Sequence, residues 1–214
     1  MAVQFLFDGP SAAPATVLLA HGAGAAMDNP VMAMLAERLA ASGLRVARFE
    51  FAYMAARRNG GSKRPPPKVE LLSEEYRQAV TDLRGQIGAG PLVIGGKSMG
   101  GRVASLIADD LGDQAKVQGL LCFGYPFHPQ GKPEKLRTAH LANLRLPTLI
   151  CHGTRDPFGS REEVADYALS PMISMCWAED GDHDLKPRKR VTGRDHASQL
   201  DQICHSAAAW IATL

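Results

Sequence analysis

The fold of this chain is decided by residues 91–106, which read PLVIGGKSMGGRVASL. The stretch begins with a short apolar run, residues 92–94, which predicts a buried strand, and it ends in apolar residues at the spacing of one helix face. A strand that turns into a helix this abruptly forces the residue at the turn, Ser98, into a strained backbone conformation. Gly96 and Gly100, two residues before and after it, leave room for neighbouring backbone. We therefore expect the Ser98 hydroxyl to stand out at the carboxyl end of the strand, in front of a helix N-terminus.

The pentapeptide GKSMG at 96–100 matches the G-x-S-x-G nucleophile elbow, and it has the strand and the helix that this motif requires. The helix N-terminus behind the serine favours negative charge nearby. A phosphate-binding loop of the form G-x-x-x-x-G-K-[ST] would need glycine at position 91, where the chain has Pro91. An ordinary glycine-rich turn between a strand and a helix is the remaining alternative.

The composition is that of a globular protein with one domain, residues 1–214. Of the 214 residues, 45% are hydrophobic and 21% are charged, and the net charge of +2 favours neither a nucleic acid nor a membrane partner. The four cysteines have no metal-ligand spacing, which is typical of buried thiols in a reducing compartment. The N-terminal residues MAVQFLFDGP predict a strand rather than a signal peptide. We expect a cytoplasmic location.

Apolar runs that predict strands alternate with segments of helical spacing along the chain. Strands are expected at 3–7, 16–20, 45–51, 92–94, 117–123, 148–151 and 173–177; helices are expected at 30–42, 69–87, 99–111, near 136–144, after Ser160 and around 200–211. Asn29-Pro30 and the Ser160-x-x-Glu163 capping box mark helix starts, and Gly112 is expected to end a helix. Residues 52–68 predict a long irregular loop. This order predicts an α/β fold, a mostly parallel central sheet with helices on both faces and the ligand site at the carboxyl ends of the strands.

A serine hydroxyl needs a base to take its proton, and the base works best when a carboxylate orients it. Asp156 lies a few residues past the strand at 148–151, and His183 occupies the matching place after the strand at 173–177. Both are expected at the edge of the sheet where Ser98 lies. The chain order is thus Ser98, Asp156, His183.

Each of these assignments has alternatives. His196 is the second choice for the base, whereas His152 lies close to its strand end and is expected to be a packed loop residue. The carboxylates that compete with Asp156 are Asp180, Asp182 and Asp184, which we interpret as solvated loop residues. The other histidines, His128, His140 and His205, are interpreted as surface or structural residues.

With these elements in order, the chain resembles an α/β-hydrolase, a family in which the triad follows the order Ser…Asp…His. Its HGAG, FEFAYM, GGKSMGG, GTRDPF and DHD segments resemble those of small, lidless members of the dienelactone-hydrolase branch, and within it a group related to testis-expressed hydrolase-like proteins. The resemblance implies an oxyanion hole formed by the backbone N–H groups of Met99 and Ala23, with Gly22 or Gly24 as alternatives to Ala23. It also implies a structural use of the His21 ring.

The segment between the strands at 117–123 and 148–151 is too short for a cap domain, so we expect a minimal lid or none. Several aromatic and apolar residues that follow strand ends are expected to line the substrate pocket, although ordinary packing is an equal alternative for each: His21, Phe51, Tyr53, Met54, Tyr125, Phe127 and Phe158. Two basic clusters are interpreted as solvated loop faces, with an anion-binding role as the alternative: Arg57, Arg58, Lys63 and Arg64, and Lys186, Arg188, Lys189 and Arg190.

The sequence therefore predicts a serine hydrolase that cleaves small carboxylic esters or thioesters through an acyl-enzyme on Ser98. No metal or organic cofactor is expected, and the protein is expected to be a monomer or a weak homodimer. Lys97 is expected to stabilise the elbow through an ion pair. The alternatives are a non-catalytic interaction module on the same scaffold and a peptidase or amidase of the same fold.

Overall fold

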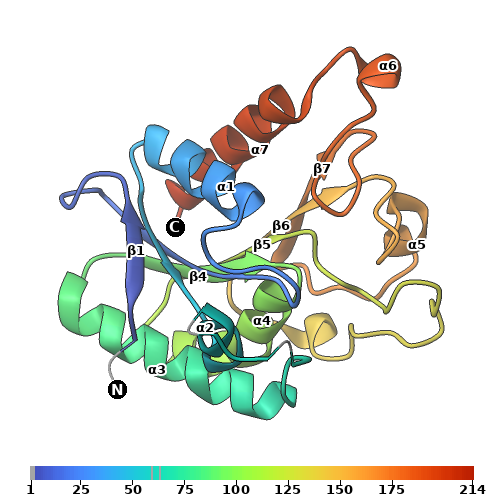
Figure 1. Ribbon diagram of the computed structural model, residues 1–214. Helices are drawn as coiled ribbons and strands as arrows, with labels where there is room; N and C mark the ends of the chain where they lie inside the picture. The colour runs from blue at the N-terminus through green and yellow to red at the C-terminus, as the bar shows by residue number, and fades with distance from the viewer. Residues whose placement is uncertain (1–2, 59, 63) are drawn as a thin grey trace.

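The computed structural model describes residues 3–58, 60–62 and 64–214, and its centre is a seven-stranded sheet (Figure 1). The strand order is β1-β3-β2-β4-β5-β6-β7; only β1, at the edge, is antiparallel to its neighbour. The strands are β1 Phe5–Asp8, β2 Thr16–Ala20, β3 Arg45–Phe49, β4 Leu92–Lys97, β5 Gly119–Phe123, β6 Thr148–Gly153 and β7 Ile173–Ala178. The predicted α/β fold with a mostly parallel sheet is confirmed.

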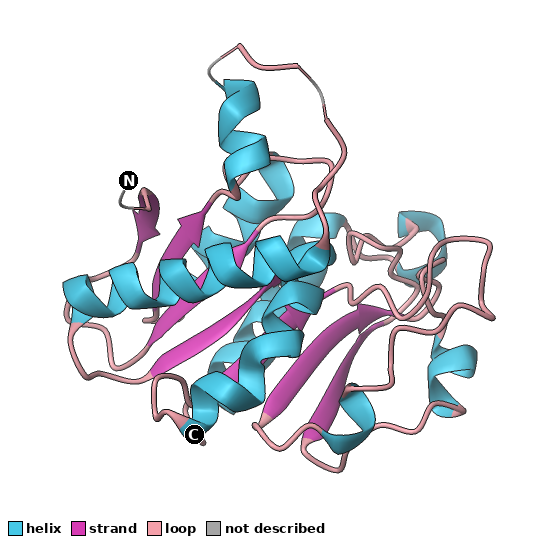
Figure 2. Ribbon diagram, turned by 90° about the horizontal axis from the view of Figure 1, so that it is seen from below, coloured by secondary structure: helices cyan, strands magenta, loops and turns pink. Residues whose placement is uncertain are grey.

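Helices cover both faces of the sheet. The helices are α1 Pro30–Ala41, α2 Ala52–Arg58, α3 Val69–Ile87, α4 Met99–Asp113, α5 Arg161–Ala165, α6 Lys189–Thr192 and α7 His196–Ile211, with one 3₁₀ turn, η1 Leu141–Asn143. Figures 1 and 2 show α1 and α7 side by side on one face, and α3 and α4 on the other. One hydrophobic core therefore lies under α1 and α7, and a second lies under α3 and α4.

Local signals in the sequence set several helix ends. The Asn29 side chain accepts hydrogen bonds from the N–H groups of Val31 and Met32, and Pro30 opens α1. The capping box is formed as predicted: Ser160 Oγ accepts from the Glu163 N–H at 3.3 Å, and Glu163 Oε2 accepts from the Ser160 N–H at 2.7 Å. These caps fix where α1 begins after β2 and where α5 begins after β6.

Residues 52–68 differ from the predicted irregular loop, because the short helix α2 occupies their first half. The segment AYMAARR consists mainly of good helix formers, and the Ala52 N–H at its start is accepted by Glu75 Oε2 at 2.7 Å. The glycines and prolines that predicted a loop lie only after it. The strand expected at 45–51 accordingly ends at Phe49.

Three smaller expectations are also corrected. Helix α4 continues through Gly112 to Asp113, since Gly112 lies in helical backbone against the Leu146 side chain and does not cap the helix. The helix expected near 136–144 is only the 3₁₀ turn η1, and the four-residue helix α6 was not predicted. None of these changes moves the carboxyl edge of the sheet.

Candidate active site

Ser98 lies at the turn between β4 and α4 with backbone angles φ 52° and ψ −116°. Positive φ is a strained conformation for a residue with a side chain, and here the surroundings enforce it. The Ser98 N–H donates to the Phe123 carbonyl at 2.9 Å, and the Ser98 carbonyl accepts from the Arg102 N–H at 3.0 Å, which opens α4. The Ser98 side chain is therefore held at the carboxyl edge of the sheet.

The two glycines around the serine allow β2 to approach the elbow. A Cβ atom on Gly96 or on Gly100 would lie 2.3 Å from the Ala20 carbonyl oxygen, far inside van der Waals contact. Gly96 also has a φ of 157°, which a residue with a Cβ rarely adopts. The spacing of small residues in the motif thus follows from the contact between β2 and the start of α4.

Three side chains from three strand ends form a continuous hydrogen-bonded chain. His183 Nε2 lies 2.8 Å from Ser98 Oγ, and His183 Nδ1 lies 2.8 Å from Asp156 Oδ2. Because a carboxylate accepts the Nδ1 proton, Nε2 is left as the acceptor for the serine hydroxyl. This is the geometry in which a histidine removes a proton from a serine.

Asp156 is fully buried, and its hydrogen bonds keep it ionised. Burial by itself raises the pKa of the carboxyl, but the hydrogen bond from His183, the nearby His152 ring and the Phe158 N–H outweigh it, so that the net pKa lies below the ordinary value. The carboxylate can therefore hold the His183 ring in one orientation.

The loops that carry Asp156 and His183 are tied to each other. Arg155 Nε donates to the Asp180 carbonyl at 2.8 Å, and Thr154 Oγ1 accepts from the Asp180 N–H at 2.8 Å. A Cβ atom on Gly153 would lie 2.3 Å from the Gly181 carbonyl oxygen, so only glycine permits this approach. Arg188 Nε in turn donates to Asp180 Oδ1 at 3.0 Å and closes the far side of the His183 loop.

The alternative histidines do not reach Ser98. His196 Nε2 bonds to the Asp184 carbonyl at 2.8 Å on the outer side of the loop. His152 is buried, and its Nε2 bonds to the Gly159 carbonyl at 2.8 Å. His21 is also buried: its Nε2 accepts from the Phe51 N–H and its Nδ1 bonds to the Gly22 carbonyl. Both buried rings order the loops around the site.

A second serine–histidine pair lies behind the site. Ser105 Oγ is 2.8 Å from His140 Nε2, but Ser105 is buried and its hydroxyl also bonds to the Arg102 carbonyl at 2.7 Å. Burial lowers the pKa of His140 to about 4, and no carboxylate hydrogen bonds to its ring within the described part of the chain. This pair lacks the exposure and the orienting carboxylate that Ser98 and His183 have.

The predicted oxyanion donors lie next to Ser98. Met99 is the first residue of α4, where N–H groups have no acceptor within the helix. A Cβ atom on Gly22 would be 3.7 Å from the Ser98 Cβ, so the loop that carries Ala23 passes beside the nucleophile. Among residues 3–58, 60–62 and 64–214, no turn, loop or cap hydrogen bond is donated by the N–H of Met99 or of Ala23. Neither N–H group therefore has an acceptor among these residues, as the predicted role requires.

A cavity of about 400 Å³ opens in front of Ser98. It is lined by Ala23, Pro66, Pro67, Val69, Leu72, Ser98, Met99, Arg102, Pro126, Arg137 and Phe158. Of the residues predicted to form the pocket, Phe158 lines it, with its ring centroid 4.3 Å from that of His183. The loop after α2 contributes the two prolines.

The other predicted pocket residues lie elsewhere. Phe51, Met54, Tyr125 and Phe127 are buried, as His21 is, and none of them lines the cavity. Met54 lies within α2, and Phe51, Tyr125 and Phe127 pack in the hydrophobic core. Tyr53 is half-buried, and its hydroxyl donates to the Ala23 carbonyl at 2.9 Å. Tyr53 therefore holds the loop that carries Ala23 and does not line the cavity.

Lys97 is buried beside the elbow and forms the predicted ion pair, with Nζ 3.2 Å from Asp184 Oδ1. Burial lowers the pKa of its amino group, and the charge of Asp184 partly opposes this effect. Since Asp184 follows His183 directly, the ion pair connects the nucleophile strand to the histidine loop.

Two residues that the sequence analysis did not single out also line the cavity, namely Arg102 and Arg137. Arg102 lies four residues after Ser98, one turn into α4, and this spacing was the signal that could have identified it. Arg137 comes from the irregular segment after β5, where the sequence gives no periodic pattern to place it.

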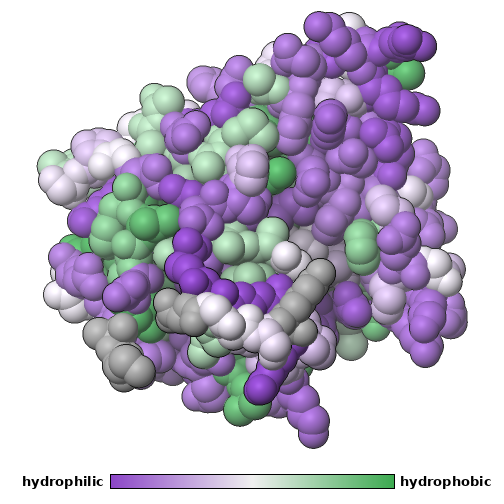
Figure 3. All heavy atoms as spheres, viewed as in Figure 1, coloured by the Kyte–Doolittle hydropathy of each residue, from purple (hydrophilic) through white to green (hydrophobic). Residues whose placement is uncertain are grey.

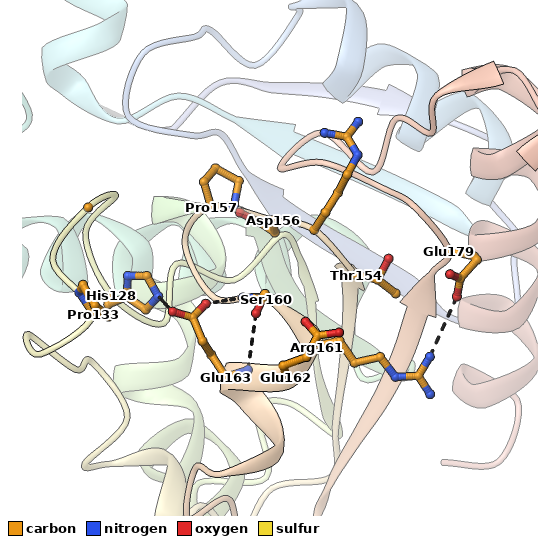
Figure 4. A pocket seen from close by; sticks show the side chains of 12 residues that line it. His128, Pro133, Thr154, Asp156, Pro157, Ser160, Arg161, Glu162, Glu163 and Glu179 are labelled. Atoms are coloured by element: carbon orange, nitrogen blue, oxygen red, sulfur yellow. Dashed lines mark hydrogen bonds and ion pairs between the residues drawn. The ribbon is translucent and has the colours of Figure 1, made fainter. Parts of the chain in front are cut away.

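A larger hollow of about 580 Å³ adjoins the Asp156 loop (Figure 4). Figure 4 shows two of its acidic side chains engaged with neighbours: Glu163 with His128 and Ser160, and Glu179 with Arg161. Neither Ser98 nor His183 lines it. We interpret this hollow as a surface feature on the outer side of the loop that carries Asp156, separate from the cavity in front of Ser98.

One arginine of each predicted basic cluster forms ion pairs among the described residues. Arg58 pairs with Asp28 and Glu50, and Arg188 pairs with Asp180. Figure 3 shows a hydrophilic surface over α6, where the second cluster lies. Lys63 lies outside the described residues.

In the part of the chain that the structure describes, no group of acidic, histidine and cysteine side chains has the arrangement of a metal site. None of the described helices has the length and apolar character that a membrane crossing requires.

Comparison with known proteins agrees with this architecture. A family model described as an alpha/beta hydrolase domain matches residues 13–212. The chain belongs to this alpha/beta hydrolase family. The fold is similar to an alpha-beta serine hydrolase homologue from Coxiella burnetii, at 17% identity over 96% of this chain and 91% of that one, with a TM-score of 0.71.

Two further solved structures show the same fold. A serine hydrolase without a lid from Xanthomonas campestris is 18% identical over 97% of this chain and 89% of that one, with a TM-score of 0.71. A dienelactone hydrolase from Anabaena variabilis is 20% identical over 99% of this chain and 91% of that one, with a TM-score of 0.74. The predicted small, lidless alpha/beta-hydrolase architecture is confirmed, whereas the narrower resemblance to testis-expressed hydrolase-like proteins stays a prediction.

Proposed function

We propose that this protein is a serine hydrolase that cleaves small carboxylic esters or thioesters through an acyl-enzyme on Ser98. The observation that supports this most directly is the chain of two 2.8 Å hydrogen bonds from Asp156 through His183 to Ser98. The strained elbow, the two free N–H groups beside it and the cavity of about 400 Å³ provide the other parts of such a site.

In the first half of the reaction, Ser98 Oγ attacks the carbonyl carbon of the ester while its proton passes to His183 Nε2. The negative charge that develops on the carbonyl oxygen is stabilised by the N–H groups of Met99 and Ala23 and by the N-terminus of α4. The C–O bond to the alcohol then breaks, and the proton on His183 moves to the leaving oxygen. Asp156 stabilises the imidazolium throughout.

In the second half, water enters the place left by the alcohol. His183 Nε2 takes a proton from the water as its oxygen attacks the acyl carbon, and the same N–H groups hold the oxyanion. The bond between the acyl carbon and Ser98 Oγ breaks, and the proton returns from His183 to Ser98. The products are the acid and the regenerated hydroxyl.

The test is covalent labelling with a fluorophosphonate, which reacts with activated serine hydroxyls, together with hydrolysis of p-nitrophenyl acetate and butyrate. Wild-type protein is expected to be labelled and to release nitrophenol, and Ser98→Ala is expected to lose both activities. Ser105→Ala is the matched control, because Ser105 also bonds to a histidine but lies buried behind the site. Labelling that persists in Ser98→Ala, or a folded wild-type protein that is neither labelled nor active, would refute the proposal.

A further inference from the structure

We propose that Arg102 and Arg137 form a subsite for a negatively charged oxygen group, such as a carboxylate, on the ester that Ser98 attacks. The inference rests on the proposed serine hydrolase function and specifies its substrate class: a small ester whose acyl or alcohol part carries an anion. It arises from two arginines that share one cavity with the nucleophile.

The protein backbone fixes both arginines at this cavity. Arg102 lies one turn after Ser98 on α4, and its N–H donates to the Ser98 carbonyl at 3.0 Å. The Arg137 N–H donates to the Phe127 carbonyl at 2.7 Å, and its carbonyl accepts from the Tyr125 hydroxyl at 3.2 Å. Both side chains are half-buried, so neither is a freely solvated surface arginine.

The two guanidinium groups have no carboxylate partner among the described residues. Other arginines of the chain do, as Arg58 and Arg145 illustrate. Arg102 Nε is buried and has no hydrogen-bond partner within the described part of the chain. The pKa of Arg137 is lowered, mainly by burial and further by the positive charge of Arg102. Two arginines without a carboxylate partner thus line the same cavity wall.

This arrangement is unfavourable without a ligand. A positive charge in the first turn of a helix is opposed by the helix dipole, and partial burial of an unpaired charge adds a desolvation cost. An anion between the two groups would remove their repulsion and supply the missing acceptors. Planar guanidinium groups bind carboxylates and phosphates with paired hydrogen bonds, and the small cavity limits the ligand to a small molecule.

The experiment compares matched neutral and anionic esters. For the acyl side, the pair is 4-nitrophenyl valerate and mono-(4-nitrophenyl) glutarate; for the alcohol side, it is methyl 4-(butyryloxy)benzoate and 4-(butyryloxy)benzoate. Wild-type kcat/KM is expected to be higher for the anionic member of at least one pair. In Arg102→Gln and Arg137→Gln, the ratio of anionic to neutral kcat/KM is expected to fall by about 10-fold to 100-fold.

Three controls make the outcome specific. Arg102→Lys keeps the positive charge but not the planar guanidinium group. It is expected to keep part of the preference for the anionic ester. Arg190→Gln removes an exposed charge outside the cavity and is expected to leave the ratio unchanged. Inhibition by glutarate, compared with inhibition by inorganic phosphate at equal concentration, distinguishes a carboxylate from a phosphoryl group as the preferred anion.

Fluorophosphonate labelling of Ser98 in every variant separates the two proposals. If the protein is labelled and hydrolyses the neutral esters, but neither anionic ester is preferred and the ratio does not change in the arginine variants, the anion subsite is refuted while the hydrolase function stands. If the folded protein is neither labelled nor active toward any of the esters, both proposals fail.

Discussion

At the scale of single residues, the geometry of the site depends on three side chains whose positions are fixed by their immediate neighbours. Ser98 adopts a positive φ, Asp156 is fully buried, and the His183 ring is held between them by one hydrogen bond on each nitrogen. Each of these features depends on a neighbour, either a glycine that leaves room or an N–H that is donated to the carboxylate. Two substitutions test these dependencies.

The first is Asp156→Asn, which keeps the shape of the side chain and removes its charge. The amide no longer stabilises the imidazolium and favours the wrong tautomer of His183, so kcat is expected to fall by roughly 10³–10⁴-fold. Steady-state kinetics with p-nitrophenyl butyrate measures the fall, and circular dichroism checks that the fold is retained. A folded variant within tenfold of wild-type kcat would contradict the assigned role.

The second is Gly100→Ala in the elbow. The added methyl group would lie 2.3 Å from the Ala20 carbonyl oxygen, so β2 and α4 must separate, and the free energy of unfolding is expected to fall by about 1–3 kcal/mol. Gly85→Ala is the matched control, because Gly85 lies in helix α3 with no atom within 4 Å of the new methyl group. There the gain in helix propensity is expected to stabilise the protein by about 0.5–1 kcal/mol. Urea unfolding of both variants measures the difference, and equal effects would argue against the packing explanation.

At the scale of the elements, the site is held together by bonds between neighbouring loops and between layers. The loop after β6 and the loop after β7 are joined through Arg155 and Thr154, and the far side of the second loop is closed by the Asp180–Arg188 pair. Helix α3 is joined to the sheet by the Tyr76 hydroxyl. Each of these contacts is expected to contribute to the free energy of unfolding, and substitutions can measure the contribution.

Because of the Asp180–Arg188 pair, the free energy of unfolding is expected to depend on pH in the acidic range. Hydrogen bonds from Arg188 lower the pKa of Asp180 to about 2, below its ordinary value in an unfolded chain, which is about 3.9. A depressed pKa contributes stability that is fully present above pH 4 and is lost as the pH falls toward 2. Asp180→Asn is therefore expected to be less stable than wild type at pH 7 and to lose less stability between pH 4 and pH 2.

Urea unfolding at a series of pH values measures this difference. Arg188→Met removes the partner and is expected to reproduce the flatter dependence. If Asp180→Asn and wild type lose the same stability between pH 4 and pH 2, the pair does not act as described.

Tyr76 links α3 to two strands at once. Its buried hydroxyl lies 3.0 Å from the Leu18 carbonyl and 2.7 Å from the Gly95 carbonyl, and it accepts from the Gly95 N–H at 2.8 Å. Tyr76→Phe removes these buried hydrogen bonds and is expected to cost about 1–3 kcal/mol of unfolding free energy. Tyr167→Phe is the control, because Tyr167 is half-buried and its hydroxyl makes no hydrogen bond within the described residues; its effect is expected to stay within about 0.5 kcal/mol. Thermal or urea unfolding distinguishes the two.

At the scale of the whole molecule, the strand order places the site. The chain adds β3 on one side of β2 and β4 on the other, so the connections diverge between β2 and β4. A crevice forms at such a point, at the carboxyl ends of the strands. The loop that carries Ala23 follows β2 and Ser98 follows β4, which explains why segments far apart in the sequence meet there.

The absence of a cap among the described residues is expected to limit the length of acyl chain that the site can cover. Among the described helices and strands, only the 3₁₀ turn η1 comes between β5 and β6, where a cap domain would be inserted. The cavity in front of Ser98 has a volume of about 400 Å³. Each buried CH₂ group of an acyl chain can raise kcat/KM by about fourfold, but carbons that extend into water contribute nothing. We therefore expect kcat/KM for p-nitrophenyl esters to rise over short acyl chains and then to stop rising. A steady rise through palmitate, measured below its solubility limit, would contradict an open site.

The sequence by itself determined the strands, most helices and the order of the candidate triad, because each depends on local chemistry: apolar runs, caps, and a serine between two glycines. The sequence did not reveal α2, because the glycines and prolines that follow this short helix made the whole segment 52–68 resemble an irregular loop. It also assigned His21, Met54, Tyr125 and Phe127 to the pocket, because their position after a strand does not reveal what covers them.

Only the tertiary structure decided the distances between Ser98, His183 and Asp156, the ties between their loops, and the presence of Arg102 and Arg137 in one cavity. The physical reason is that these contacts join residues far apart in the chain. Their separation is set by the twist and order of the sheet and by the packing of its loops, which no local pattern encodes.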